Sequence, residues 1–206
     1  MATRRIPLFP LSLVLFPGRQ LPLHIFEERY KLMVARCVQS QAPFGVVLAS
    51  GDGIATIGCT ANILQIAKTY EDGRMDIVTR GESAYRILEL NNDEPYLQGD
   101  VEMLADDLQP GSAAAAKELH DLFEKCYRLF SDGSSPADED DPAVSLAYQV
   151  AADLPLDLDV RQAVLEVRVE ADRRQLLIER LKEILPELER IQRARSKVSG
   201  NGHAPN

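Results

Sequence analysis

Apolar and polar residues are patterned differently on the two sides of Pro110. Before it, short runs rich in Val, Ile, Thr and Tyr are separated by polar turns; they cover residues 44–50, 55–70, 74–81, 84–91 and 95–106. β-Branched and aromatic side chains suit a pleated surface, so each run predicts a strand. Asp72-Gly73, between the second and third runs, predicts a tight hairpin turn. Several strands at short spacing favour a small closed or nearly closed barrel.

One helix is expected within this half. Phe26, Tyr30, Met33 and Cys37 recur at spacings of four, three and four, which places them in one stripe of a helix. We expect this helix to lie across the barrel as a lid, with the aromatic rings of the stripe facing the core.

Helical periodicity dominates beyond Pro110. Ser112 is the predicted N-cap of a helix that continues to residue 130, and Asp141-Pro142 predicts the start of another that ends near residue 154. Residues 160–194 predict a long helix with a kink or a break at Pro186, because its apolar positions follow an alternating four-three rhythm at Leu177, Leu181, Ile184, Leu188 and Ile191. We therefore expect a barrel over residues 1–110, a helical bundle over 111–195 and a disordered tail over 196–206.

Composition limits the classes of function. The 206 residues have a formal net charge of −9, which argues against nucleic acid as the main partner. The three cysteines are widely separated, as is typical of free thiols in a reducing compartment. Pro7, Pro10 and Pro17 interrupt the N-terminal apolar run, so we expect no signal peptide or membrane span, and we interpret these prolines as structural residues of rigid turns and barrel packing. These features predict a cytoplasmic protein.

The sequence has no motif that predicts catalysis. It lacks the Gly-rich loop with Lys and Ser or Thr that holds ATP phosphates, and it lacks a G-x-S-x-G nucleophile turn. His24, His120 and His203 have no His or Cys neighbour at the spacing of metal ligands, so we expect neither a metal nor another cofactor.

Several segments resemble a known family. They are IPLFPLSLVLFPGRQLPLHIFEERYKLM at the N-terminus, then FGVVLAS, IGCTANI, DGRMDIVTRGESAYRI, PYLQGDVEML and finally VRQAVLEVRVEADRRQLLIERL. Together they resemble, in order, the N-terminal substrate-binding domain of Lon protease over most of residues 4–192. The resemblance implies an α+β fold, with a PUA-like β-barrel followed by an α-helical bundle. In full-length Lon an ATPase and a serine-lysine protease domain follow this region, and this chain stops before both.

The resemblance thus implies a stand-alone, non-enzymatic module that binds unfolded or partly folded polypeptides, or an adaptor in proteolysis that works with a protease or chaperone. Mapped onto the early helix, it makes Glu28 and Arg29 candidate polar contacts and Phe26 and Tyr30 candidate apolar ones. Two alternatives remain open at this point. One is a hydrolase with a site near His24, and the other is RNA binding through the PUA-like barrel.

Overall fold

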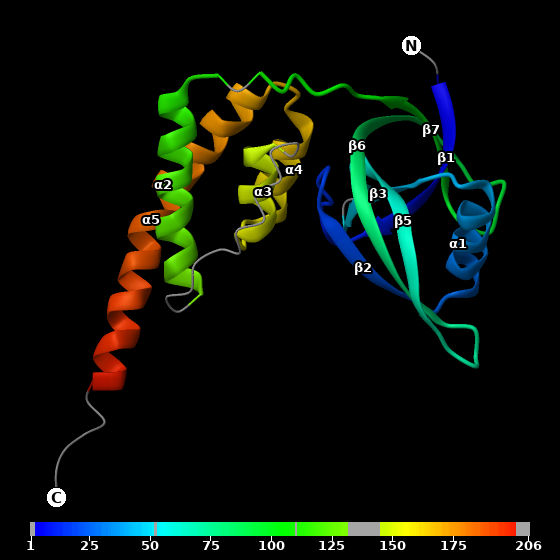
Figure 1. Ribbon diagram of the computed structural model, residues 1–206, viewed down its shortest axis with the longest axis horizontal. Coiled ribbons are helices and arrows are strands. Elements are labelled where there is room, and N and C mark those ends of the chain that lie inside the picture. The colour runs from blue at the N-terminus through cyan, green and yellow to red at the C-terminus, as the bar shows by residue number, and fades with distance from the viewer. Residues whose placement is uncertain (1–2, 52, 110, 132–144, 201–206) are drawn as a thin grey trace, which may run out of the picture.

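The computed structural model describes residues 3–51, 53–109, 111–131 and 145–200, with side chains described up to residue 195. The strands are β1 (Thr3–Leu11), β2 (Gln20–Ile25), β3 (Phe44–Ser50), β4 (Gly53–Ile54), β5 (Ile57–Thr69), β6 (Met75–Asn91) and β7 (Gln98–Met103). The helices are α1 (Glu28–Ser40), α2 (Ala113–Phe130), α3 (Leu146–Asp153), α4 (Leu158–Glu166) and α5 (Glu170–Gly200). Figure 1 shows the strands and α1 on one side of the molecule and α2 to α5 on the other, which confirms the predicted α+β class.

The sheet closes on itself. Its strands follow the order β1-β7-β6-β5-β3, and β1 pairs again with β3 in parallel, from Leu8↔Gly45 to Leu11↔Leu48. β6 is long enough to pair with three strands. It pairs with β5 along most of its length, with β2 at its beginning and with β7 at its end. The result is a ring of strands with β2 added at β6, and the ring encloses apolar side chains.

The structure corrects the prediction for one pair of strands in this half. The runs 74–81 and 84–91 form one strand, β6, because β5 pairs with both halves of it. Pro17 lies in a turn, as expected. Pro7 and Pro10 belong to the barrel, as expected, but they lie within β1 and not in turns. Pro7 and Pro10 do not start turns because β1 pairs with two different strands, which hold it extended. Pro7 lies opposite Gln98 of β7, and Pro10 lies opposite Val47 of β3.

Tyr85 fills the inside of the ring. Its hydroxyl donates to the Val46 carbonyl at 3.1 Å, and the side chain is fully buried. A Cβ at Gly58 would lie 2.4 Å from the Val46 oxygen and 2.5 Å from the Tyr85 hydroxyl oxygen. Glycine is therefore required at position 58, where β5 passes the Tyr85 side chain.

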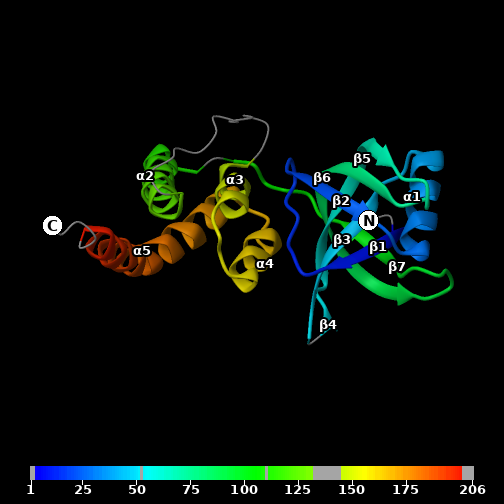
Figure 2. The same cartoon turned by 90° about the horizontal axis from the view of Figure 1, so that it is seen from below.

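Helix α1 packs on the barrel through Tyr30, Met33, Val34 and Cys37. It lies on the side of the barrel away from α2 to α5 in both views (Figures 1 and 2). The prediction that Tyr30 faces the core is confirmed, whereas the same prediction for Phe26 is wrong, since Phe26 is 60% exposed. The helix begins only at Glu28, so Phe26 lies in the preceding extended segment and outside the helical stripe.

The helical half begins as predicted, with the Ser112 hydroxyl accepting from the Ala115 N–H at 3.1 Å. Asp141-Pro142 lies outside the described residues. The helix expected after it is described from Leu146, with Ser145 as its N-cap: the Ser145 hydroxyl accepts from the Tyr148 N–H at 3.2 Å.

The long helix predicted over residues 160–194 is divided, and the division is not at Pro186. α4 ends at Glu166, α5 begins at Glu170, and α5 continues past Pro186. The cause is the segment that follows the barrel. The Asp107 N–H donates to the Arg168 carbonyl at 2.8 Å, and the Glu170 N–H donates to the Asp107 carbonyl at 2.9 Å, so the backbone between α4 and α5 is held out of the helix.

The predicted division into domains stays a prediction. The last strand ends at Met103 and α2 begins at Ala113, so the elements change on either side of the proposed boundary at residue 110. The bounds of α5 extend to Gly200, into the predicted tail, and residues 201–206 lie outside the described part of the chain.

Candidate functional site

The four residues nominated from the sequence lie at the start of α1, but they differ in exposure. Phe26 and Glu28 are exposed, and Glu28 pairs with Lys31 at 2.8 Å. Arg29 pairs with Glu27 at 2.8 Å, and its guanidinium lies 4.6 Å from the centroid of the Tyr30 ring. Tyr30 is only 8% exposed, so it offers little surface to a partner. Their role in binding stays a prediction.

His24 belongs to a polar and aromatic cluster beside Phe26. Its Nδ1 lies 2.6 Å from the Asp76 carboxylate, to which the Tyr70 hydroxyl donates at 2.8 Å. Both hydrogen bonds lower the pKa of Asp76 below its usual value, and the one from His24 has the larger effect. The rings of Phe26 and Tyr70 lie 6.1 Å and 5.7 Å from the His24 ring. None of these neighbours of His24 is a Ser or Cys nucleophile, so their geometry adds nothing to the hydrolase alternative.

A concave surface lies at the other end of α1. We call it the α1–β5 groove; it has a volume of about 500 Å³ and is lined by Cys37, Val38, Gln41, Ala42, Asn62, Ile63, Leu64, Gln65 and Ile66. None of these side chains carries a charge at neutral pH. Val38, Leu64 and Ile66 are 44%, 52% and 45% exposed, so the groove presents aliphatic side chains from both of its walls.

The groove exists because β5 is longer than one of its two partners. Pairing between β3 and β5 ends at Phe44↔Ala61, whereas pairing between β6 and β5 continues to Thr69↔Met75. On the helical side, Gln41 adopts a left-handed conformation with φ 51° and ends α1, so the chain turns away towards β3. The helix and the outer part of β5 are left facing each other.

A register shift exposes part of the β5 wall. Ile63 pairs with Thr79 and Gln65 with Val78, so Leu64 has no partner on β6. A bulge of this kind redirects a side chain, and that of Leu64 is half exposed at the groove. The sequence carried one signal for this surface: Val38 is an apolar residue outside the stripe of its helix.

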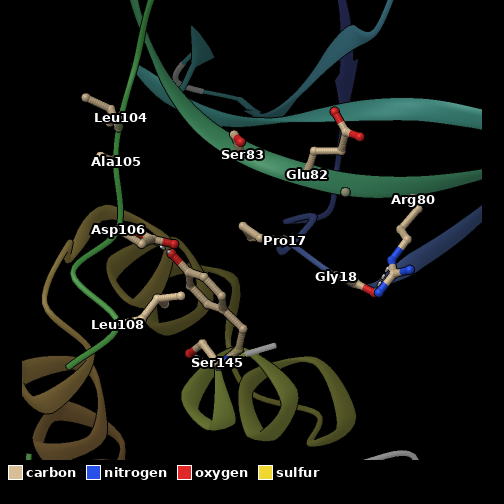
Figure 3. A pocket seen from close by; sticks show the side chains of 12 residues that line it. Pro17, Gly18, Arg80, Glu82, Ser83, Leu104, Ala105, Asp106, Leu108 and Ser145 are labelled. Carbon is tan, nitrogen blue, oxygen red and sulfur yellow. Dashed lines mark hydrogen bonds between the residues drawn. The ribbon is translucent and has the colours of Figure 1, made fainter. Parts of the chain in front are cut away.

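A second concavity, of about 530 Å³, lies between the barrel and the helices (Figure 3). Figure 3 shows Arg80, Glu82 and Ser83 on the barrel side, Asp106 and Leu108 on the connecting segment, and Ser145 at the helices. We call it the barrel–bundle pocket. In contrast to the groove, it has charged residues of both signs in its lining.

The polar groups behind the barrel–bundle pocket bond to one another. Arg173 is fully buried, and its guanidinium donates to the Tyr148 hydroxyl at 2.7 Å, to Asp106 at 3.0 Å and to Glu170 at 3.1 Å. Ser145 caps α3 and donates to Glu170, which fits a structural role. Burial raises the pKa of the Tyr148 hydroxyl well above its usual value, so it stays protonated and serves as a hydrogen-bonding group.

The described residues give little support to a reactive cysteine or a metal site. Burial raises the pKa of the Cys37 and Cys126 thiols to about 11, so few are ionised at neutral pH. In the described part of the chain, no three His, Cys, Asp or Glu side chains are grouped so that they could hold a metal ion. Over the same residues, no helix is long and apolar enough to cross a bilayer.

Comparison with known proteins gives one consistent result. Residues 5–183 match the family model of the ATP-dependent protease La (LON) substrate-binding domain. Lon protease of Anaeromyxobacter dehalogenans and Lon protease 2 of Myxococcus xanthus are each 26% identical to the chain, over 85% of its length. The chain spans only 23% of the length of each of these relatives.

Solved structures agree on the fold. A Lon N-terminal domain protein from Xanthomonas campestris has a TM-score of 0.62 and 24% identity, and the match covers 85% of this chain and 98% of that one. The N-terminal domain of the Mycobacterium avium complex Lon protease has a TM-score of 0.62 and 14% identity, with 87% and 98% covered. Because the family model matches most of its length, the chain belongs to the LON substrate-binding domain family.

Proposed function

We propose that the chain is a non-catalytic module that binds unfolded or partly folded polypeptides in the α1–β5 groove. The observation that carries this proposal is the exposure of three aliphatic side chains, Val38, Leu64 and Ile66, around a concave surface without a charged lining residue. Apolar contact is sequence-tolerant, so it suits a protein whose partners share exposed apolar residues but no common motif.

Membership of the family supports the same function. The family is named for substrate binding, and the curated relatives are proteases of which this chain matches about a quarter. We propose that the chain delivers its clients to a separate protease or chaperone, as an adaptor would. The exposed surface around Phe26 would then serve as an additional contact.

The two surfaces lie along the same strand. β5 forms one wall of the α1–β5 groove and ends at Thr69, directly before Tyr70 of the His24 cluster. α1 lies beside it, since the Lys31 ammonium donates to the Asp72 carbonyl at 3.1 Å in the turn after β5. An extended polypeptide in the groove could therefore continue towards Phe26, Glu28 and Arg29.

The test is binding of a fluorescently labelled, unfolded and alkylated protein, measured by anisotropy. Replacing Leu64 and Ile66 together by Ser removes the aliphatic area of one wall. We expect the dissociation constant to rise about tenfold or more, since burial of one such side chain is worth roughly 1.5–3 kcal/mol and tenfold corresponds to about 1.4 kcal/mol.

The matched control replaces Leu88 and Leu90 by Ser. These residues are 54% and 44% exposed, and Leu90 pairs with Gly99 of β7, away from the groove. We expect this variant to bind like the unmodified protein. Equal affinity in both double variants would contradict the assignment to the groove, and no binding by the unmodified protein would contradict the function itself.

A further inference from the structure

We infer that a client occupies the α1–β5 groove as an added β-strand, hydrogen bonded to the free edge of β5. The inference rests on the proposed function and adds the mode of binding and the chemistry of the bound segment.

The edge in question begins where β3 stops pairing. From Asn62 to Thr69, β5 pairs with β6 on one side, and among the described residues no strand pairs with it on the other. An unpaired strand edge presents a row of N–H and C=O groups that can hydrogen bond to an extended peptide. The part of this edge within the groove, Asn62–Ile66, spans roughly 13 Å at about 3.3 Å per residue.

Helix α1 forms the opposite wall along this edge. Lys31, near the start of α1, contacts Asp72 beyond the end of β5, while Cys37 and Val38, near its end, line the groove with Asn62–Ile66. The helix therefore runs antiparallel to the strand and flanks its free edge. A groove between a helix and a strand edge offers an extended peptide backbone hydrogen bonds on one side and apolar contacts on the other, which is the arrangement of strand-addition sites.

The lining determines what the segment must be. A charged client residue would lose hydration in the groove without finding an opposite charge, because the lining residues are uncharged. Side chains of a strand alternate between its two faces, so every second client residue would contact Val38, Leu64 or Ile66. We therefore assign the site to an uncharged, extended segment with aliphatic or aromatic residues at alternate positions.

The irregularity of β5 argues against a second copy of this chain as the occupant. Register shifts occur between Ile63 and Gln65 and again between Ile66 and Lys68. Bulges and an edge lysine are features that limit edge-to-edge pairing between identical strands. A short, flexible client segment can follow the twisted edge of β5. Two copies of β5 are both held in their barrels, so they could pair only if their irregular edges had complementary twist.

The experiment uses a labelled, blocked seven-residue peptide with Val and Thr at alternating positions, and two series of N-methylated versions. One series carries N-methyl groups on the odd-numbered amides and the other on the even-numbered amides. Because successive N–H groups of a strand point to opposite sides, only one series removes donors that face β5. We expect that series to bind at least about tenfold more weakly than the parent and the other to bind within about twofold of it.

Other results would overturn strand addition. These are equal affinity of both series and the parent, equal loss in both series, or failure of the parent peptide to bind while the unfolded protein binds. In each of those cases the proposed function would stand, whereas it would fall only if the unfolded protein also did not bind. Sedimentation of the protein alone provides the remaining check, since a dimer abolished by Gln65→Pro would show that a second copy occupies the edge.

Discussion

The ring of Phe16 stacks on that of Tyr148, with centroids 5.4 Å apart and planes inclined by 29°. Phe16 lies between β1 and β2, and Tyr148 lies on α3, so this contact joins the barrel to the helices. An ion pair between Arg19 and Asp153 and a hydrogen bond of 3.0 Å from Gln162 to the Ile57 carbonyl reinforce the junction.

We predict that the two rings are energetically coupled. Phe16→Leu and Tyr148→Leu should each lower the free energy of unfolding, because both side chains are fully buried. The double variant should lose less than the sum of the single losses by about 0.5–1.5 kcal/mol, as is typical of an aromatic pair. Urea denaturation of the four proteins measures this, and strictly additive losses would show that the stacking contributes nothing beyond burial.

Arg173 should be the most sensitive charged residue. Arg173→Met leaves the buried Glu170 carboxylate short of a partner and removes a donor to Asp106, so we expect the free energy of unfolding to fall by about 3–5 kcal/mol. Arg180→Met is the matched control. Arg180 pairs with Asp157 and Glu183 at the surface, where such pairs contribute about 0–1 kcal/mol. Similar losses in the two variants would mean that the buried network does not anchor the connecting segment.

The thiols should be unreactive in the native protein. Cys37, Cys59 and Cys126 are buried, and burial raises the pKa of all three above that of a free thiol. At about pH 8 a chromogenic disulfide reagent should leave them unmodified, while all of them should react once the protein is unfolded in guanidinium. Rapid modification of Cys37 in the native state would show that α1 separates from the barrel.

Asp76 should make stability depend on acid pH. Its pKa in the folded protein is lowered from 3.8, chiefly by the hydrogen bond from His24. The stabilisation is therefore present above pH 3.8 and is lost as the pH falls through the lowered value. Asp76→Asn should melt at a lower temperature than the unmodified protein at neutral pH, and the difference should disappear in strong acid. A difference that persisted there would point to a loss other than that of the charge.

Local signals in the sequence were sufficient for part of the fold. Ser112 was identifiable as a cap and Phe44–Ser50 as a strand, because an N-cap and a β-branched run act over a few residues. The break between α4 and α5 could not be found in this way. It depends on the backbone of Asp107, about sixty residues away in the sequence, which pairs with residues 168–170.

The candidate site was even less accessible to sequence reasoning. Leu64 and Ile66 are ordinary apolar residues of a predicted strand, and their exposure follows from the point at which β3 stops pairing with β5. The helical stripe predicts a core position for Phe26, whereas Phe26 precedes the helix and is exposed, because α1 begins only at Glu28. Resemblance identified the family, and only the arrangement of strands locates the groove.

Hydrogen exchange of the backbone amides, with and without a saturating unfolded client, is the most direct test of the α1–β5 groove as the binding surface. Exchange should slow at Cys37, Val38, Gln41, Ala42 and residues 62–66, which line the groove, and stay unchanged at the barrel–bundle pocket. Slower exchange confined to residues 80–83 and 104–108, with no change along β5, would place the client at the other concavity and contradict the assignment.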